Sequence, residues 1–143
     1  MRRVFPFLLA LVLTHMAHAA DNVSVKDAWV RLPPPGAKVV GAYLTLEAKQ
    51  AMTLTGAKSP AAASVELHTM SMHDGVMQMR QLPSIALEAG KPVKLEPGGL
   101  HLMLIDLKQP LKAGDTVQID LQLSPRKGKP QTLRVPAVVR TPN

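Results

Sequence analysis

Histidine and methionine gather in one short stretch of the sequence, "HTMSMHDGVMQMR" at positions 68–80. A second His-x-Met pair, His101 and Met103, follows in "PGGLHLML". Imidazole nitrogen and thioether sulfur are both neutral metal ligands, and the thioether favours soft Cu(I) over zinc, magnesium or calcium. This combination of side chains therefore indicates a soft-metal site.

Methionine also fills irregular gaps in hydrophobic cores, so a methionine-rich strand is often packing alone. Here five methionines lie between Met70 and Met103, and Met52 is the only other one after residue 19. This clustering favours a site over packing. The chain has no cysteine, which excludes thiolate nucleophiles, Cys-ligated zinc, iron–sulfur clusters and blue-copper centres.

The first stretch has the pattern of a β-hairpin. Asp74 and Gly75 form a strong turn signal, because a type I′ turn requires positive φ at both central residues. Side chains alternate along a strand, so the methionines and His68 should share one face, with His68 and Met79 as diagonal neighbours. The expected register pairs His73 with Val76, Met72 with Met77, Met70 with Met79 and His68 with Gln81.

Short alternating segments continue along the rest of the chain. The clearest is "TVQIDLQLS" at 116–124, where apolar and polar residues alternate strictly. Residues 57–65 are compatible with a helical turn. Thirteen prolines and nine glycines separate the segments, so we predict an all-β, antiparallel Greek-key sandwich or small barrel. The other expected strands are 23–31, 41–47, 52–55, 65–72, 76–82, 93–95, 100–107 and 132–135.

The amino terminus predicts export. Residues 1–19 combine a basic start, a short apolar run and small residues at Ala17 and Ala19, as a cleaved signal peptide requires. One domain, 20–143, would remain, with a net charge reduced from +7 to about +5 by loss of two arginines. No other segment approaches the roughly 18 apolar residues of a membrane helix. The basic residues are scattered and aromatics are few, so we expect no nucleic-acid binding.

The spacing also resembles a known family. The intervals His68-x10-Met79-x21-His101-x-Met103 are those of the periplasmic copper chaperones called PCuAC, whose motif is H-x10-M-x21-H-x-M. The segments "AWVRLPPPGAKVVGAYLTL", "VELHTM", "DGVMQMR" and "PGGLHLML" resemble the family's blocks as well. The resemblance covers nearly all of residues 20–143.

This resemblance implies a cupredoxin-like fold that binds one Cu(I) in the periplasm, with His68, Met79, His101 and Met103 as ligands. It also implies delivery of copper to the copper domain of cytochrome c oxidase subunit II, alone or with a thioredoxin-like assembly factor. Some relatives carry a His- and Met-rich tail that binds Cu(II); this chain ends "RVPAVVRTPN", and we expect no such tail site. Met70, Met72 and Met77 have two interpretations: a soft hydrophobic rim, or transient ligands during copper transfer. We interpret His73, beside the turn, as a solvated loop residue.

Two alternatives remain open at this stage. Cleavage after Ala17 would expose His18 as the first residue, as in a Cu(II)-binding protein or copper enzyme. A metal-free β-sandwich could instead use the methionine face to bind proteins. The sequence suggests no Ser-His-Asp set and no paired catalytic carboxylates, so we expect no enzymatic activity.

Overall fold

The structure is a computed structural model that describes residues 22–142, and this part of the chain contains strands but no helix. None of the described residues forms a helix of the length and apolarity needed to cross a membrane. The predicted signal peptide, residues 1–19, and His18 of the alternative copper site lie outside the described residues. The strands are β1 (Val23–Arg31), β2 (Val39–Ala48), β3 (Met52–Lys58), β4 (Ala62–His73), β5 (Val76–Leu82), β6 (Ile85–Leu87), β7 (Val93–Leu95), β8 (His101–Leu107), β9 (Thr116–Pro125) and β10 (Gln131–Arg140).

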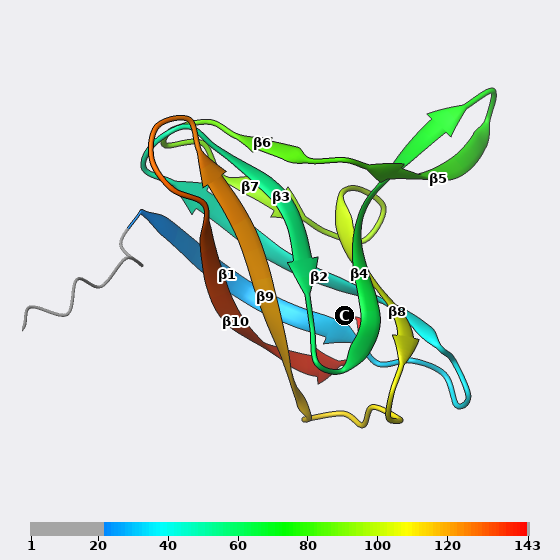
Figure 1. Cartoon of the computed structure of the whole chain (residues 1–143). Coiled ribbons are helices and arrows are strands. Elements are labelled where there is room, and N and C mark those ends of the chain that lie inside the picture. The colour runs from blue at the N-terminus through cyan, green and yellow to red at the C-terminus, as the bar shows by residue number, and fades with distance from the viewer. Residues whose placement is uncertain (1–21, 143) are drawn as a thin grey trace, which may run out of the picture.

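Seven of these strands close into a barrel (Figure 1). Their order is β4-β8-β2-β1-β10-β9-β3, and the ring closes where Ala57 of β3 pairs with Val65 of β4. Strands β5, β6 and β7 add to β4, β3 and β2. The predicted all-β, cupredoxin-like architecture is confirmed. The pairing of β1 with β10 is parallel, and all the other strand pairs are antiparallel.

The core lies inside this barrel and follows the alternation predicted for β9. Val117, Ile119, Leu121 and Leu123 are buried, and the residues between them are more exposed. Strands β2 and β8 supply a second group of buried leucines, among them Leu44, Leu102 and Leu104. Since the chain has no cysteine, this packed interior stabilises the barrel without disulfide bonds.

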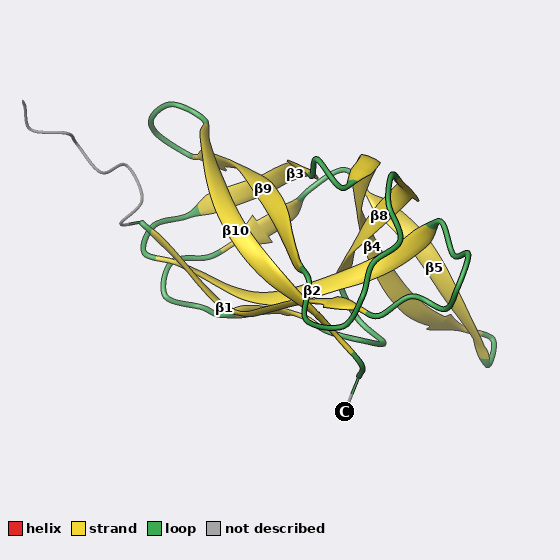
Figure 2. Ribbon diagram, turned by 90° about the horizontal axis from the view of Figure 1, so that it is seen from below, coloured by secondary structure: helices red, strands yellow, loops and turns green. Residues whose placement is uncertain are grey.

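The hairpin β4–β5 projects from one end of the barrel, and Figure 2 shows the same projection from below. Every residue of β5 before Leu82 is exposed. The last three residues of β4, from Ser71 to His73, are exposed as well. The hairpin therefore contributes little to the core, and its side chains are available for another purpose.

The structure differs from the sequence prediction at three places. Residues 57–65 do not contain a helical turn: β3 and β4 are joined by a tight turn in which the Ser59 hydroxyl donates to the Gln118 carbonyl (2.6 Å) and accepts from the Ala61 amide (3.2 Å). Strand β6 was not predicted. Strand β10 continues through Pro136, because β1 pairs with β10 only from Val138 onward and the missing N–H interrupts no bond to β1.

Candidate metal centre

The pairing of β4 with β8 brings the two histidines together. His68 and His101 lie directly opposite each other, with their ring centroids 5.6 Å apart. Their neighbours Leu67 and Leu102 are buried in the core. Because side chains alternate across a strand, both imidazoles lie on the outer face of the barrel wall. Met103, two residues beyond His101, shares this face.

The hairpin brings a further thioether to the same face. Its register is the predicted one, with Met70 opposite Met79 and Met72 opposite Met77. The turn also forms as predicted, since φ is 50° at Asp74 and 78° at Gly75. Met70 is partly buried, whereas Met79 is 50% exposed. Met79 therefore lies at the solvent-facing side of the group.

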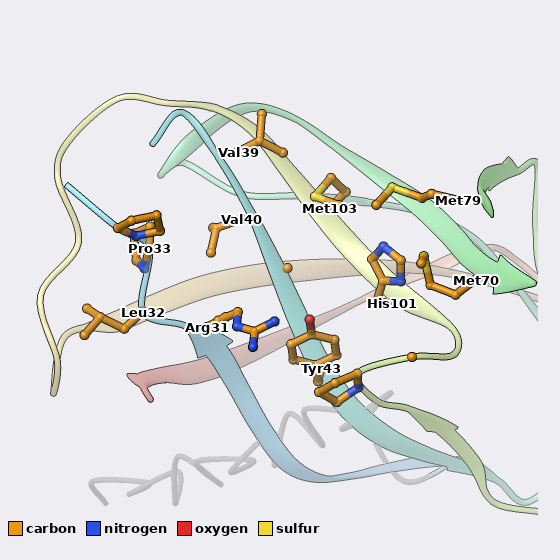
Figure 3. Close-up of a pocket in the computed structure, with 14 residues that line it drawn as sticks. Arg31, Leu32, Pro33, Val39, Val40, Tyr43, Met70, Met79, His101 and Met103 are labelled. Atoms are coloured by element: carbon orange, nitrogen blue, oxygen red, sulfur yellow. The ribbon is translucent and has the colours of Figure 1, made fainter. Parts of the chain in front are cut away.

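A hollow of about 360 Å³ marks the place where these side chains meet. Met70, Met79, His101 and Met103 line it, together with Tyr43 and residues 31–34. Figure 3 shows the three methionines lying around the His101 ring. His68 does not line the hollow but lies directly beside His101. The structure thus brings all four residues of the predicted ligand set to one place.

His101 is held by a backbone acceptor. The residue is 4% exposed, and its Nδ1 donates to the carbonyl oxygen of Gly99 at 3.1 Å. The same carbonyl accepts a hydrogen bond from the Met70 amide at 3.2 Å, which ties the β7–β8 loop to β4. A neutral imidazole that donates from Nδ1 keeps its lone pair on Nε2. Nε2 is therefore the atom that His101 offers to a metal.

His68 is held by a carboxylate. Its Nε2 lies 2.8 Å from Oε2 of Glu66, so the ring donates from Nε2 and keeps its lone pair on Nδ1. That Nδ1 is buried and has no hydrogen-bond partner within residues 22–142. A buried nitrogen without a partner is unfavourable, and a metal ion would satisfy it. A carboxylate that orients a metal-binding imidazole is a common arrangement at metal sites.

The sequence prediction missed Glu66. The sequence feature that could have pointed to Glu66 is the spacing Glu66-x-His68, which places the two side chains on the same face of a strand. Most surface carboxylates are simply solvated, so this spacing alone does not single out Glu66. The structure singles out Glu66 through its 2.8 Å contact with His68.

Aromatic side chains support the inner side of the hollow. The Tyr43 ring lies 6.3 Å from that of His101 and 4.7 Å from that of Trp29. Gly41 is opposite Met103 in the sheet, and a Cβ on Gly41 would approach the Tyr43 hydroxyl to 2.6 Å. A glycine is therefore required at this position for Tyr43 to lie beside the site.

The remaining hairpin side chains lie outside the hollow. His73, beside the turn, is largely exposed and lies 3.6 Å from the Asp74 carboxylate. Met72 and Met77 are exposed on the methionine face, beyond Met70 and Met79. Within residues 22–142 no group of three or more His, Asp or Glu side chains could hold a metal. The donors at the hollow are two imidazoles and a set of thioethers.

The barrel fold is that of solved PCuAC domains. The solved structure "Copper-bound PCuAC domain from PmoF2" superposes with a TM-score of 0.67 at 23% identity, over 85% of this chain and 94% of that one. The Cu(I) form of DR1885 from Deinococcus radiodurans superposes with a TM-score of 0.64 at 34% identity, over 87% and 82% of the two chains. The resemblance to PCuAC proteins is confirmed.

Residues 23–137 match the family model described as "LpqE-like: Putative lipoprotein LpqE-like", and the chain belongs to this family. A relative from Leifsonia xyli subsp. xyli, "Putative lipoprotein Lxx21020", is 32% identical over 117 residues. That alignment covers 81% of this chain and 70% of the relative.

Proposed function

We propose that this protein is a copper chaperone that binds one Cu(I) and transfers it to an acceptor protein. The observation that carries the proposal is the pair of facing imidazoles, each with one nitrogen engaged by a fixed acceptor and the other free. The ligands are His68 through Nδ1, His101 through Nε2, and the sulfur atoms of Met79 and Met103.

The chemistry of this donor set supports Cu(I) in particular. Two imidazoles and two thioethers are all neutral, and thioether sulfur selects Cu(I) over harder divalent ions. None of the four donors must lose a proton from a charged or thiol group first. A relative at 34% identity was solved as "CuI-DR1885", which supports the same oxidation state here.

The gradation of exposure supports transfer rather than permanent storage. His101 is buried at 4% exposure, whereas Met79 at the solvent side is 50% exposed. An incoming ligand from an acceptor protein can displace the Met79 sulfur first, while the histidines still hold the ion. Copper then leaves by stepwise ligand exchange without passing through free solution.

The resemblance to PCuAC proteins supports a cellular compartment and an acceptor protein for this transfer. We infer export through cleavage of residues 1–19 and function of the domain 20–143 in the periplasm. The acceptor is the copper domain of cytochrome c oxidase subunit II, reached directly or through a thioredoxin-like assembly factor. The protein itself catalyses no reaction in this scheme.

Competition titration with a Cu(I) chelator, under anaerobic and reducing conditions, tests the binding site. The wild type should bind one equivalent tightly. His101→Ala should lower the Cu(I) affinity by more than the roughly 10- to 100-fold that removal of a residue orienting a ligand costs. Met79→Leu should lower the Cu(I) affinity less than His101→Ala does, because Met79 is half-exposed and three ligands remain. Met52→Leu is the matched control, since Met52 is a buried core residue. Unchanged affinity in both site variants would rule out this ligand set.

Delivery needs a separate test. The copper-loaded protein is mixed with a soluble oxidase copper domain, and copper in each protein is measured after separation. We expect copper to move to the oxidase domain faster than a diffusible chelator in excess can intercept it. Complete interception by the chelator would show that the metal passes through solution, and the chaperone role would be wrong.

A further inference from the structure

The outer rung of the hairpin, Met72 and Met77, is not used by the proposed copper centre. The two residues are directly opposite each other, one rung beyond Met70 and Met79. Their exposed fractions are 65% and 45%. All four methionines lie on the face that leads to the hollow, because they occupy alternate positions of paired strands.

Packing does not explain methionine at these two positions. Burying a methionine side chain stabilises a fold, but about half or more of that gain is absent at Met72 and Met77, because both side chains are exposed. The opposite face of the hairpin carries polar residues at Thr69, Ser71 and Gln78. Thioethers are therefore confined to one face, and this face ends at His68 and His101.

We propose that Met72 and Met77 form an outer two-thioether site that captures Cu(I) and passes it to the inner centre. This proposal rests on the proposed function, because it names the route by which copper enters that centre. Directly opposed residues have Cβ atoms about 4.5–5.5 Å apart, and diagonal neighbours on the next rung stay within reach of long side chains. An ion held by the outer rung is thus accessible to Met70 and Met79.

The transfer is ligand exchange alone. The copper–sulfur bonds to Met72 and Met77 break as bonds form to the sulfur atoms of Met79 and Met103 and to the free ring nitrogens of His68 and His101, and no electron or proton moves. Cu(I) with two thioethers is held less tightly than Cu(I) with two imidazoles and two thioethers, so the ion moves inward spontaneously. Divalent ions such as zinc bind thioethers poorly, so the outer rung also discriminates against them.

Methyl NMR of the protein labelled with ¹³C-methyl methionine tests the outer site. Cu(I) is added anaerobically to the wild type and to Met72→Leu/Met77→Leu, a change that keeps side-chain volume. In the wild type the first equivalent should shift the methyl signals of Met79 and Met103. Further Cu(I) should then shift those of Met72 and Met77. In the double variant the first equivalent should bind unchanged.

The rate of copper uptake tests the route. Transfer from a small Cu(I)–chelator complex should be at least about threefold slower in the double variant, because the outer site raises the local copper concentration at the hollow. Met52→Leu is the control, since it removes one buried thioether and should load at the wild-type rate. A hairpin that only docks a partner protein predicts unchanged uptake from the chelator, and that result would overturn the proposal.

The two proposals fail in different ways. If Met72 and Met77 signals stay fixed at two equivalents while the first equivalent binds tightly, the outer site is wrong and the chaperone function stands. If Met72 and Met77 shift but the signals of Met79 and Met103 never do, the outer site stands and the assigned inner centre is wrong.

Discussion

At the scale of single residues, the two imidazoles are held by acceptors of different kinds. Gly99 presents a backbone carbonyl to His101, and Glu66 presents a carboxylate to His68. A hydrogen bond to a charged acceptor is stronger than one between neutral groups. The carboxylate therefore holds the His68 ring through Nε2 and leaves the buried Nδ1 without a partner within residues 22–142, and it is the acceptor that mutation can remove.

Removing Glu66 should weaken copper binding without removing a ligand. We expect Glu66→Ala to lower Cu(I) affinity by about 10- to 100-fold, because the His68 ring is then free to rotate. Glu66→Gln should retain most of the affinity, since its amide oxygen still accepts the Nε2 proton. Competition titration measures both, and ¹⁵N NMR of the His68 ring reports which nitrogen carries the proton. Equal losses in the two variants would contradict a positioning role.

The sequence predicts residues of the site unequally well. The positions of His68, Met79, His101 and Met103 follow from their spacing and from the resemblance that it supports. The Gly99 carbonyl could not be predicted, because its role depends on how the β7–β8 loop folds against Met70. Backbone acceptors carry no signal in residue type, so only the structure identifies this one.

At the scale of elements, the site is divided between a barrel wall and a projecting hairpin. Strand β8 belongs to the barrel and alternates core leucines with His101 and Met103. Among residues 22–142, strand β5 pairs only with β4, and it is exposed along most of its length. Changes in the hairpin should therefore alter copper binding more than they alter the stability of the fold.

Gly75→Ala tests this separation. Gly75 has a φ of 78°, where a side chain costs about 1–2 kcal/mol. The hairpin tip should loosen and Cu(I) affinity should fall modestly, while the thermal unfolding midpoint barely moves. Gly114→Ala is the matched control, since Gly114 has a φ of 90° in the β8–β9 turn and its replacement should leave copper affinity unchanged. A loss of stability larger in Gly75→Ala than in the control would contradict the separation.

Most strands could be predicted because apolar and polar residues alternate along them. Strand β6 has three residues, Ile85–Leu87, which is too short to show a period. The end of β10 was missed because Pro136 normally indicates a strand boundary. The strand tolerates this proline because of where β1 begins to pair with β10, and that is a long-range property of the fold.

At the scale of the whole molecule, the barrel must close before the site exists. The parallel pair of β1 with β10 joins segments far apart in the sequence. The ring closes where β3 pairs with β4, the next strand along the chain. The pairing of β1 with β10 could not be predicted from local patterns, because it depends on how the entire sheet curls. The core packing that favours this closure therefore also determines whether copper can bind.

Copper binding and core packing should make additive contributions to the free energy of unfolding. Leu121→Ala removes a fully buried side chain and should cost about 2–5 kcal/mol. Cu(I) at about 1,000 times the dissociation constant should raise the free energy of unfolding by about 4 kcal/mol in both the variant and the wild type. Thermal unfolding with and without Cu(I) measures both terms. A chelator should abolish the increment, and His101→Ala should show little of it. An increment of the same size in His101→Ala would place the ion elsewhere.

The facing position of His68 and His101 has a consequence for the life of the chain. One imidazole comes from β4 and the other from β8, and they meet only when those strands pair. A newly made or damaged chain that has not paired them cannot hold copper in the inner centre. Copper loading at the proposed centre would therefore report that β4 and β8 have paired natively, and a misfolded chain should bind no copper there.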